Sequence, residues 1–587
     1  MVDAMAPCAA NWSTAECAAA LAGSDNEFWL SSRPGGYLHT GLFNTWNLSA
    51  ALGGARSYAV AAQSEADVQV TVAFAAQHNL RLVVKSTGHD WYGRSAGAGA
   101  LVLWTHELDT VEFADAFVPA GCPASAAGPA ATVGAGTQFF QLYPQAQARG
   151  RLLIGGTCDS VSVGGCWVAG CYGSLSRRYG SAASNLVQVR AVLANGTAVT
   201  ASACSHPDLF WSLRGGGSGV AAVVTAYTAR SHPAPAFLLS GGLTFTASTP
   251  EAFAELVEAF LERVDGQLQG PEWGGGGYGV GRTPDGAYRL FPGPHGYEKL
   301  PADAQAVFQP LLDFVAHDPG RRFNVSGGWK VWNASTWKPT NPLPWVEMHP
   351  DREISVQLTG SFTRHVPARL TSSASGRRLV AAALANLTCN LPVGMQGDVY
   401  VMYDKGQHNV PADVAEQVRN SPQLPQVLDS TGLLLVQFTV PSLPTLPRTA
   451  ALLAALWPRL QVYIVQTPSD ALWVPCAAGA NGSATAAETC WAGLDARIKA
   501  TQSRLAGIKA DLLAAFPNLD AQGQPLSGAY WAETDYHDDQ WQQSQWGAAN
   551  YARLLAIKDA YDPNGLFYCH HCVGSERWQP DGNCPIA

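Results

Sequence analysis

Residues 155–196 read GGTCDSVSVGGCWVAGCYGSLSRRYGSAASNLVQVRAVLANG, and this stretch says most about the fold. Six glycines fall between Gly155 and Gly173. Glycines at this density let a backbone approach a ligand closely or adopt positive φ, although plain turns use them as well. The stretch closes on a β-branched run, so it predicts a glycine-rich loop that leads into a strand.

Two further glycine loops flank this stretch. Residues 80–95, LRLVVKSTGHDWYGRS, place a strand before a turn at Ser86, Thr87 and Gly88, and residues 208–227 contain the run GGGSG. Backbone N–H groups of such turns can hold phosphate, so three of them in one unit suggest a dinucleotide. Neither flanking loop opens a strand-turn-helix unit with an acidic residue about 20 positions on, which disfavours a Rossmann NAD site.

The patterns along the chain predict an α+β fold. From residue 56 to 231, short β-branched runs alternate with helical patterns, which indicates an α/β unit. A proline-rich break opens residues 232–528, where helical and strand patterns mix, and we expect an α+β domain with an antiparallel sheet there. Residues 529–587 carry one amphipathic helix and a cysteine-rich end, and residues 1–55 form an N-terminal segment.

The composition and charge of the chain limit the classes of molecule that it is expected to bind. The chain has 587 residues, 47% of them hydrophobic, and a net charge of -9 with Lys and Arg scattered. Nucleic acid and anionic membranes are therefore disfavoured, and a small-molecule substrate is expected. No apolar run reaches the roughly 20 residues that span a bilayer, so no membrane span is expected.

Cysteines and glycosylation sequons predict a secreted protein. Thirteen cysteines are heavy use for a reducing compartment, and seven asparagines stand in Asn-X-Ser/Thr sequons: Asn11, Asn47, Asn195, Asn324, Asn333, Asn386 and Asn481. If Cys158 is bonded to something other than sulfur, the other twelve cysteines can all pair. The expected local disulfides join Cys8 to Cys17 and two cysteines of the group Cys569, Cys572 and Cys584. A zinc site at residues 569–572, Cys-His-His-Cys, is the alternative for that group.

These motifs together resemble the berberine bridge enzyme-like oxidases, which belong to the vanillyl-alcohol-oxidase superfamily of FAD proteins. The resemblance rests on residues 86–90 (STGHD), 156–165 (GTCDSVSVGG), 172–185, 208–217 and 550–567, where the chain ends the motif with DPNGLF. It covers both segments expected to form an FAD domain, and the middle of the chain matches only loosely.

The resemblance implies a PCMH-type FAD-binding domain of two α/β subdomains in residues 56–231, to which residues 529–587 return. In this family the histidine of the first motif bonds the flavin 8α-methyl and the cysteine of the second bonds C6, which are His89 and Cys158 here. Two bonds accompany a raised flavin potential and an open site. The further residues expected around FAD are Ser86, Thr87, Gly88, Asp90, Gly156, Val161, Gly164, Gly165, Tyr172, Asn185 and Asn550. We expect a monomer.

Two positions depart from the family pattern. Relatives commonly have a histidine after Gly-Gly and a glycine before Tyr-Gly, where this chain has Cys166 and Cys171. We expect either two small buried thiols or one additional disulfide, so the flavin loop is held differently from the family pattern.

A base must accept the hydroxyl proton when hydride leaves an alcohol carbon. In many relatives the segment before the last helix reads Tyr-X-Asn-Tyr, and Glu533 replaces the second tyrosine here. A partly buried carboxylate can do the same work, with Tyr530 as its hydrogen-bond neighbour. Tyr172 and Gln437 are the other candidates, although surface exposure or ring packing would also explain these residues.

The sequence thus favours a secreted oxidase that passes hydride from an alcohol or sugar hemiacetal to FAD and reduces O2 to hydrogen peroxide. Sugars, oligosaccharides and aromatic alcohols are the expected substrates, since nineteen tryptophans suit stacking on rings. Val161 occupies a position where, in relatives, valine leaves a pocket for O2. The alternatives are oxidation of an amine, use of another electron acceptor, and a glycosylated binding protein with a disabled flavin fold.

Overall fold

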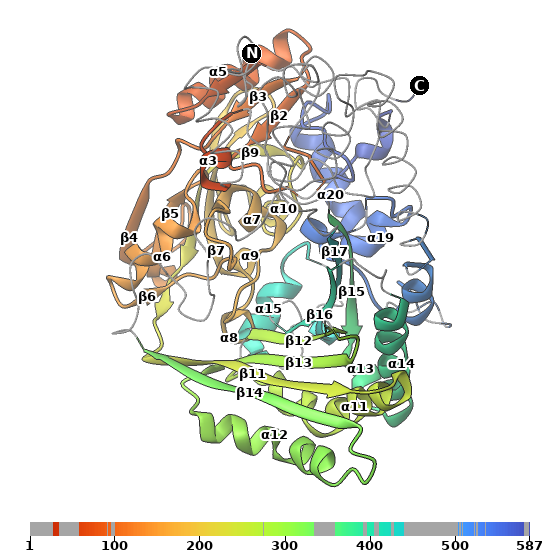
Figure 1. Ribbon diagram of the computed structural model, residues 1–587. Helices are drawn as coiled ribbons and strands as arrows, with labels where there is room; N and C mark the ends of the chain where they lie inside the picture. Colours follow the sequence, from red (N-terminus) through yellow and green to blue (C-terminus); the bar gives the residue numbers. More distant parts are fainter. Residues whose placement is uncertain are drawn as a thin grey trace, which may run out of the picture.

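A computed structural model describes residues 27–34, 58–90, 92–95, 100–273, 275–283, 285–333, 359–390, 396–403, 410–423, 428–439 and, with short gaps, 503–586. Three larger sheets organise these residues (Figure 1). Two of them lie in the first half of the chain, and the third lies below them, as drawn, beside the C-terminal segment. This arrangement confirms the α+β class.

The first sheet is parallel and has three strands. Its order is β1–β3–β2, from Tyr58–Ala61, Leu101–Trp104 and Leu82–Lys85. Helix α5 (Glu65–Gln77) crosses between the first two strands in sequence and buries Val68 and Val72 against the sheet. Ser64 caps this helix because its side chain accepts a hydrogen bond from the Asp67 backbone N–H.

The second sheet has five strands and is antiparallel throughout. Its order is β4–β5–β9–β7–β8, from Val111–Phe117, Gly128–Gly134, Ala222–Arg230, Leu186–Leu193 and Ala198–Ser202. The alternation of strand and helix patterns did not reveal this direction, because the helices between the strands are short. These helices are α6 (Phe139–Gln147), α7 (Val163–Ala169), α8 (Ser176–Tyr179), α9 (Ala182–Asn185) and α10 (Pro207–Ser212).

The third sheet has seven antiparallel strands in the order β14–β11–β13–β12–β16–β17–β15. The strands are Phe323–Asn333, Phe237–Ala247, Tyr288–Tyr297, Gly275–Arg282, Gln396–Met402, Ser430–Thr439 and Thr359–Pro367. Helices α11 (Pro250–Arg263), α12 (Pro301–Ala316) and α14 (Ala374–Asn390) supply apolar side chains to one core with it. Pro250 at the first helical position and the Thr249 cap start α11, which then buries one apolar face.

The C-terminal segment packs against the five-stranded unit. Trp546, which directly follows helix α19 (Trp541–Gln545), and Leu554 of helix α20 (Ala548–Tyr561) lie in the same core as Trp167. Arg553 of α20 forms an ion pair with Asp208 of α10 at 2.7 Å. The smaller elements are α3 (Glu27–Ser31), α13 (Ala368–Thr371), α15 (Ala412–Arg419), the strand pair β6 (Arg151–Leu152) and β10 (His232–Pro233), and the 3-10 turns η2 (Ala124–Ala126), η3 (Asp265–Gln269), η7 (Trp531–Glu533) and η8 (Ser575–Arg577).

A buried arginine joins the five-stranded unit to the large sheet. Arg177 of α8 is fully buried, and it donates hydrogen bonds to the carbonyls of Tyr403 and Gln269 at 2.8 and 2.9 Å. The Asp265 carboxylate accepts from the Tyr403 hydroxyl at 2.6 Å. Burial raises the pKa of Asp265 to about 6, against the opposing effect of these hydrogen bonds and of the Arg177 charge.

The disulfides of the structure can be compared with the cysteine pairs expected from the sequence. The described residues contain the pairs Cys122–Cys204, Cys166–Cys171 and Cys569–Cys572. The last pair confirms a local disulfide in the C-terminal group and removes both thiolates that a zinc site there would need. Complete pairing of the other twelve cysteines, which the count permits, does not occur in the structure, because Cys389 of α14 forms no disulfide and packs against the core of the large sheet. The Cys8–Cys17 prediction lies outside the described residues.

Among the sequon asparagines, Asn195, Asn324 and Asn386 are exposed. No helix within the described ranges is long and apolar enough to cross a membrane.

Candidate active site

A cavity of about 270 Å³ brings the three glycine loops together. Its wall takes residues from the 82–95 segment, from the start of α7, from the 217–219 turn and from the C-terminal segments 530–533 and 567–569. Of the residues predicted to bind FAD or act on substrate, the following line it: Ser86, Thr87, Gly88, His89, Asp90, Val161, Gly164, Gly165, Tyr530 and Glu533.

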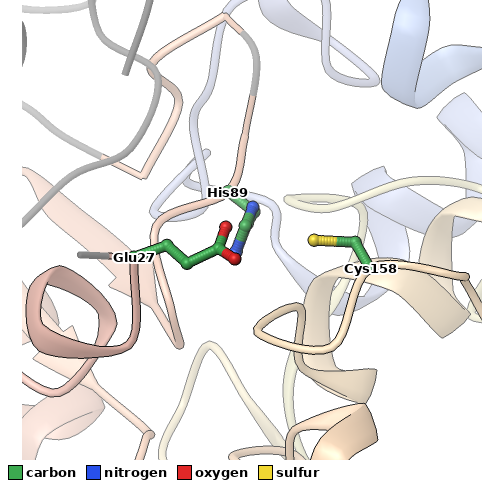
Figure 2. Close-up of side chains that lie close together, drawn as sticks. All are labelled: Glu27, His89 and Cys158. Atoms are coloured by element: carbon green, nitrogen blue, oxygen red, sulfur yellow. The ribbon is translucent and has the colours of Figure 1, made fainter. Parts of the chain in front are cut away.

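His89 and Cys158 meet beside this cavity. Their side chains and that of Glu27 each offer one donor atom, and these three atoms lie within 4.8 Å of one another. Figure 2 shows the Glu27 carboxylate directed at the imidazole from one side and the Cys158 thiol from the other. The Ser160 hydroxyl is hydrogen-bonded to His89 Nε2 at 2.8 Å and lies 3.6 Å from Cys158 Sγ. One hydroxyl thus holds both predicted attachment groups in place.

Gln138 fixes helix α3, and with it Glu27, to this cluster. The buried Gln138 amide donates to the Ser31 hydroxyl at 3.1 Å and to the Ser160 carbonyl at 2.6 Å. The Phe28 ring packs edge-on against Phe140 at 5.1 Å between centroids. Glu27 is therefore held at the cluster by a segment that precedes the FAD-binding region in sequence.

A second carboxyl group lies close to Glu27. Asp159 is 4% exposed, and its pKa is raised to about 7, first by burial and then by the negative charge of Glu27. Two neighbouring buried carboxyls do not both ionise readily, so one of them keeps its proton. In slightly acidic solution, below the raised pKa of Asp159, that carboxyl is Asp159.

Asp90 organises the loop after His89. Its carboxylate accepts from the backbone N–H groups of Tyr92 and Arg94 at 3.1 and 2.7 Å, and it pairs with the Arg94 guanidinium at 2.6 Å. That guanidinium lies 3.6 Å from the centre of the Trp531 ring. Asp90 thereby links the first glycine loop to the C-terminal segment through a cation–π contact.

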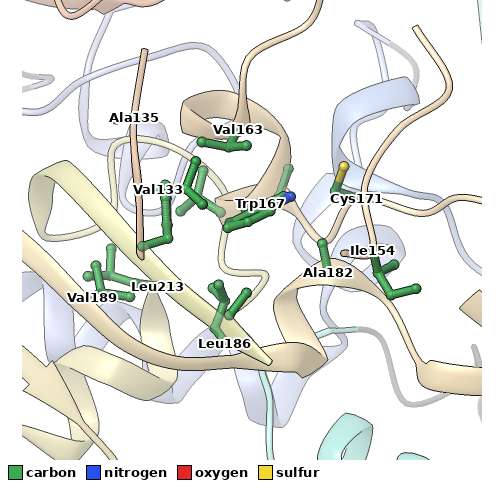
Figure 3. Close-up of a cluster of buried hydrophobic side chains, with 14 of the residues drawn as sticks. Val133, Ala135, Ile154, Val163, Trp167, Cys171, Ala182, Leu186, Val189 and Leu213 are labelled. Atoms are coloured by element: carbon green, nitrogen blue, oxygen red, sulfur yellow. The ribbon is translucent and has the colours of Figure 1, made fainter. Parts of the chain in front are cut away.

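The floor of the cavity is rigid because α7 sits on a dense core. Trp167 is fully buried among side chains of the five-stranded sheet and α9 (Figure 3). A Cβ on Gly164 would lie 2.5 Å from the Ala135 carbonyl oxygen, so this residue must be glycine for α7 to sit so close. Tyr227 donates from its hydroxyl to the Gly164 carbonyl at 2.8 Å and locks the helix start.

At the two positions that depart from the family pattern, the structure has the additional disulfide and not two buried thiols. Cys166 of α7 and Cys171 form a disulfide, and Cys166 lines the cavity. The Cys171 N–H donates to the Tyr530 hydroxyl at 3.1 Å. The bridge therefore ties the end of α7 to a predicted catalytic tyrosine.

Tyr172 lies behind Tyr530, outside the cavity wall. Its ring meets that of Tyr530 edge-on, with 5.2 Å between centroids, and its hydroxyl donates to Gln423 Oε1 at 2.9 Å. The Ser181 hydroxyl donates to the same oxygen at 3.1 Å. Tyr172 thus supports Tyr530, and Gln423, which the sequence did not single out, anchors it.

Glu533 and Tyr530 come from one short turn at the cavity. Glu533 is half-buried, and its backbone N–H donates to the Tyr530 carbonyl at 3.0 Å. Gln437 lies on β17 opposite Ser361 and Asp398 of the neighbouring strands, and its side chain is outside the described residues. Trp273, one of the tryptophans expected to suit ring stacking, is buried in the core of the large sheet.

Besides Cys158 and Tyr172, three further residues predicted to bind FAD stand outside the cavity wall. The Asn185 amide donates to the carbonyls of Tyr179 and Ser181, both at 2.8 Å, and closes the α8–α9 turn. Asn550 of α20 donates to the Gln423 carbonyl at 3.3 Å. The Gly156 carbonyl accepts from the Tyr143 hydroxyl at 2.6 Å. These contacts hold the segments that carry the wall.

His232, which is hydrogen-bonded to Asn185, makes the stability of the fold depend on pH. Its Nε2 lies 2.7 Å from Asn185 Oδ1, and its pKa is lowered to about 4, first by burial and then by the Arg230 charge. A histidine whose folded pKa is depressed stabilises the fold above its unfolded pKa near 6.5, and this contribution is lost as pH falls towards 4.

The unfolding free energy of the parent protein should fall between about pH 7 and pH 4, and protonation of His232 should account for about 3 kcal/mol of that fall. In His232→Gln this part of the fall should be absent. Urea unfolding of both proteins at the two pH values measures this difference. Equal pH dependence in the two proteins would assign the acid loss to other groups.

Sequence reasoning missed Glu27, Arg94 and Gln423. Glu27 lies far from any motif, and no local pattern marks it. Arg94 and Gln423 act through contacts with segments hundreds of residues away in sequence, at Trp531 and Tyr172.

The residues present fit a flavin. An imidazole nitrogen and a thiol sulfur stand together at one cavity, as two bonds to the same ring of a flavin, at C6 and at the methyl on C8, require. A Cβ on Gly217 would lie 2.6 Å from the Trp531 ring, so backbone alone forms that part of the wall. The same three donors would suit Zn²⁺ in type, but the glycine-lined cavity beside them favours a large ligand. Fold and site thus define a protein that binds FAD between segments from both ends of the chain.

Comparisons with known proteins agree with this class. Residues 57–202 match the family of FAD binding domains, and residues 515–574 match the family described as berberine and berberine like. An uncharacterized FAD-linked oxidoreductase of Arthroderma benhamiae is 28% identical over 95% of this chain and 86% of its own length. The VAO-type flavoprotein oxidase VAO615 of Thermothelomyces thermophilus is 29% identical over 90% of this chain and 78% of its own.

Solved structures show the same fold. The VAO-type flavoprotein MtVAO615 from Myceliophthora thermophila superimposes with a TM-score of 0.71 at 24% identity, covering 100% of this chain and 94% of its own. Glucooligosaccharide oxidase from Acremonium strictum, which carries a 6-S-cysteinyl, 8α-N1-histidyl FAD, gives 0.58 at 15% identity, covering 91% and 96%. The chain therefore carries an FAD-binding domain and a berberine-like segment, and it is similar over most of its length to FAD-linked oxidoreductases, among them a VAO-type flavoprotein oxidase.

Proposed function

We propose that this protein is an oxidase whose FAD is bonded to His89 and Cys158 and which oxidises an alcohol or sugar hemiacetal with O2. The observation that carries the proposal is the meeting of imidazole and thiol within 4.8 Å, beside a cavity lined by all three glycine loops. The doubly attached FAD of glucooligosaccharide oxidase, a protein of the same fold, supports it.

The chain supplies a proton acceptor next to the cofactor pocket. FAD, when bound, accepts a hydride and later passes two electrons to an acceptor. Glu533 lines the cavity with a carboxylate that can take the substrate hydroxyl proton, and Tyr530 lines it from the same turn. The disulfide at Cys166–Cys171 and the Tyr172 ring hold Tyr530 in position.

The proposed substrate class, an alcohol or sugar hemiacetal, is supported by proteins that share the fold. They include a chitooligosaccharide oxidase and a carbohydrate oxidase from Microdochium nivale, at 15% and 19% identity. Amine oxidation remains the second candidate, because 6-hydroxy-D-nicotine oxidase from Arthrobacter nicotinovorans has the same fold at 18% identity. A carboxylate at Glu533 favours the alcohol, because hydride leaves an alcohol carbon only as the hydroxyl proton departs to a base.

Peroxide release tests the function. Purified protein is incubated in air with sugars, oligosaccharides, aromatic alcohols and amines, and hydrogen peroxide is measured with a peroxidase-coupled dye. We expect release with members of the alcohol or sugar group. Release with amines alone would select the second candidate, and turnover with an artificial acceptor but without peroxide would make the protein a dehydrogenase.

Val161 provides a prediction for the O2 step. This residue lines the cavity, and its N–H donates to the Cys158 carbonyl at 3.3 Å, so its small side chain stands next to the proposed C6 bond. Val161→Ile adds one methylene and should slow reoxidation by O2 about tenfold or more, as steric filling of a small pocket predicts. Rapid mixing of substrate-reduced protein with oxygenated buffer measures this rate.

The rate of anaerobic reduction by substrate is the control for this variant and should stay within about twofold of the parent. An unchanged reoxidation rate in Val161→Ile would place the O2 path elsewhere.

We also propose that the protein is a secreted, monomeric glycoprotein. Three exposed sequon asparagines and three disulfides in the described parts of the chain support export, because disulfides persist in oxidising compartments.

A further inference from the structure

We infer that Glu27 is the proton acceptor that prepares His89 for attachment to FAD. This inference rests on the proposed bond between His89 and the flavin, and it assigns a role to a residue outside both matched family segments. Glu27 is 2% exposed, and its carboxylate oxygen, a His89 ring nitrogen and Cys158 Sγ lie within 4.8 Å of one another.

The placement of the Glu27 carboxylate suits a proton acceptor for His89. Figure 2 shows the Glu27 side chain extended towards the imidazole, while the thiol approaches from the opposite side. Ser160 holds the ring through Nε2 at 2.8 Å, and Gln138 binds both Ser160 and the helix that carries Glu27. Imidazole and carboxylate are thereby fixed to one frame within 4.8 Å, a separation that one bridging water or a small side-chain movement closes for proton transfer.

The charge distribution makes Glu27 the basic member of the cluster. Asp159 lies near enough to feel the Glu27 charge, and the raised pKa of Asp159 leaves it protonated in slightly acidic solution. The charge that helps to raise the pKa of Asp159 is that of Glu27, whose carboxylate stands beside the imidazole. A buried carboxylate next to a histidine raises the basicity of the nitrogen that attacks, and it can receive the N–H proton.

The attachment balances as follows. One N–C bond forms between an imidazole nitrogen of His89 and the 8α carbon, while the imidazole N–H bond and one C–H bond of the 8α-methyl break. Glu27 takes up the imidazole proton. Two electrons are removed from the joined groups, and O2 accepts them together with two protons to give hydrogen peroxide. Glu27 returns its proton in this process and ends as it began.

The experiment isolates the His89 bond by removing the other one. In a Cys158→Ala background the only covalent flavin is that on His89, and its amount per chain is read from the intact mass of denatured protein. Cys158→Ala alone should carry close to one flavin per chain. Glu27→Gln with Cys158→Ala should carry at least about tenfold less, consistent with loss of a general base.

Three comparisons separate this role from a structural one. Total FAD extracted from the native double variant should stay close to the parent value, which shows that the pocket is intact. Glu27→Asp in the same background should restore part of the covalent flavin. Asp159→Asn, a matched change at the carboxyl that already holds its proton, should leave covalent flavin unchanged.

Each outcome is decisive. Full covalent flavin in the Glu27→Gln double variant overturns the role of Glu27 while leaving the double attachment intact. Absence of covalent flavin in Cys158→Ala alone overturns the His89 bond itself. If the double variant binds no FAD, Glu27→Gln alone is digested with trypsin. Flavin on the Cys158 peptide and not on the His89 peptide then supports the inference, and flavin on both contradicts it.

Discussion

A protein carrying both His89→Ala and Cys158→Ala should release all of its flavin on denaturation, whereas either single variant should keep one covalent flavin per chain. The reason is geometric, because the two side chains reach the same cavity edge from different loops and are held by one hydroxyl, that of Ser160. Each bond can therefore form without the other. Flavin fluorescence of the protein band after SDS electrophoresis measures the covalent fraction.

Ser160→Ala is a useful companion to these variants. It removes the hydroxyl that holds both groups but neither bonding atom, so covalent flavin should fall in part and not to zero. Loss of all covalent flavin in either single variant would mean that the two bonds form in an obligatory order.

Glu533→Gln should lower the rate of flavin reduction by substrate about 10²–10⁴-fold, the range typical of a lost general base. The amide keeps the shape of the side chain at the cavity and removes its ability to accept a proton. Covalent flavin content and the visible spectrum should not change. Anaerobic stopped-flow mixing with the substrate found in the peroxide screen gives the reduction rate.

The exposed Asp539 lies in the same C-terminal segment outside the cavity, so Asp539→Asn is a matched control that should reduce at the parent rate. If Glu533→Gln also reduces at that rate, Tyr530 is the next candidate for the base. Tyr530→Phe tests it in the same assay.

Much of the fold could be predicted from sequence because the patterns are local. Alternation over residues 56–231 and the mixed patterns of 232–528 led to the α+β class, which the structure confirms. Strand direction could not be predicted, since the five-stranded sheet forms from pairs such as β5 with β9, which lie about ninety residues apart. Hydrogen-bond pairing over such distances leaves no local trace.

The residues of the candidate site also divide into those that could be predicted from local motifs and those that could not. His89, Val161 and the glycine loops were found because each belongs to a short motif, and the structure brings them to one cavity. Asn185 belongs to a motif as well, yet its amide closes a turn, because a motif records a needed residue and not the reason for it. Glu27 was missed because its partners come from elsewhere in the chain.

Mass mapping of tryptic peptides tests the central claim most directly. Cleavage after Lys85, Arg94, Arg151 and Arg177 places His89 in peptide 86–94 and Cys158 in peptide 152–177. After reduction and alkylation of the unmodified protein, the two peptides should elute as one species joined by a single FAD. Both peptides free of flavin, or flavin released into the supernatant on denaturation, would contradict the double attachment.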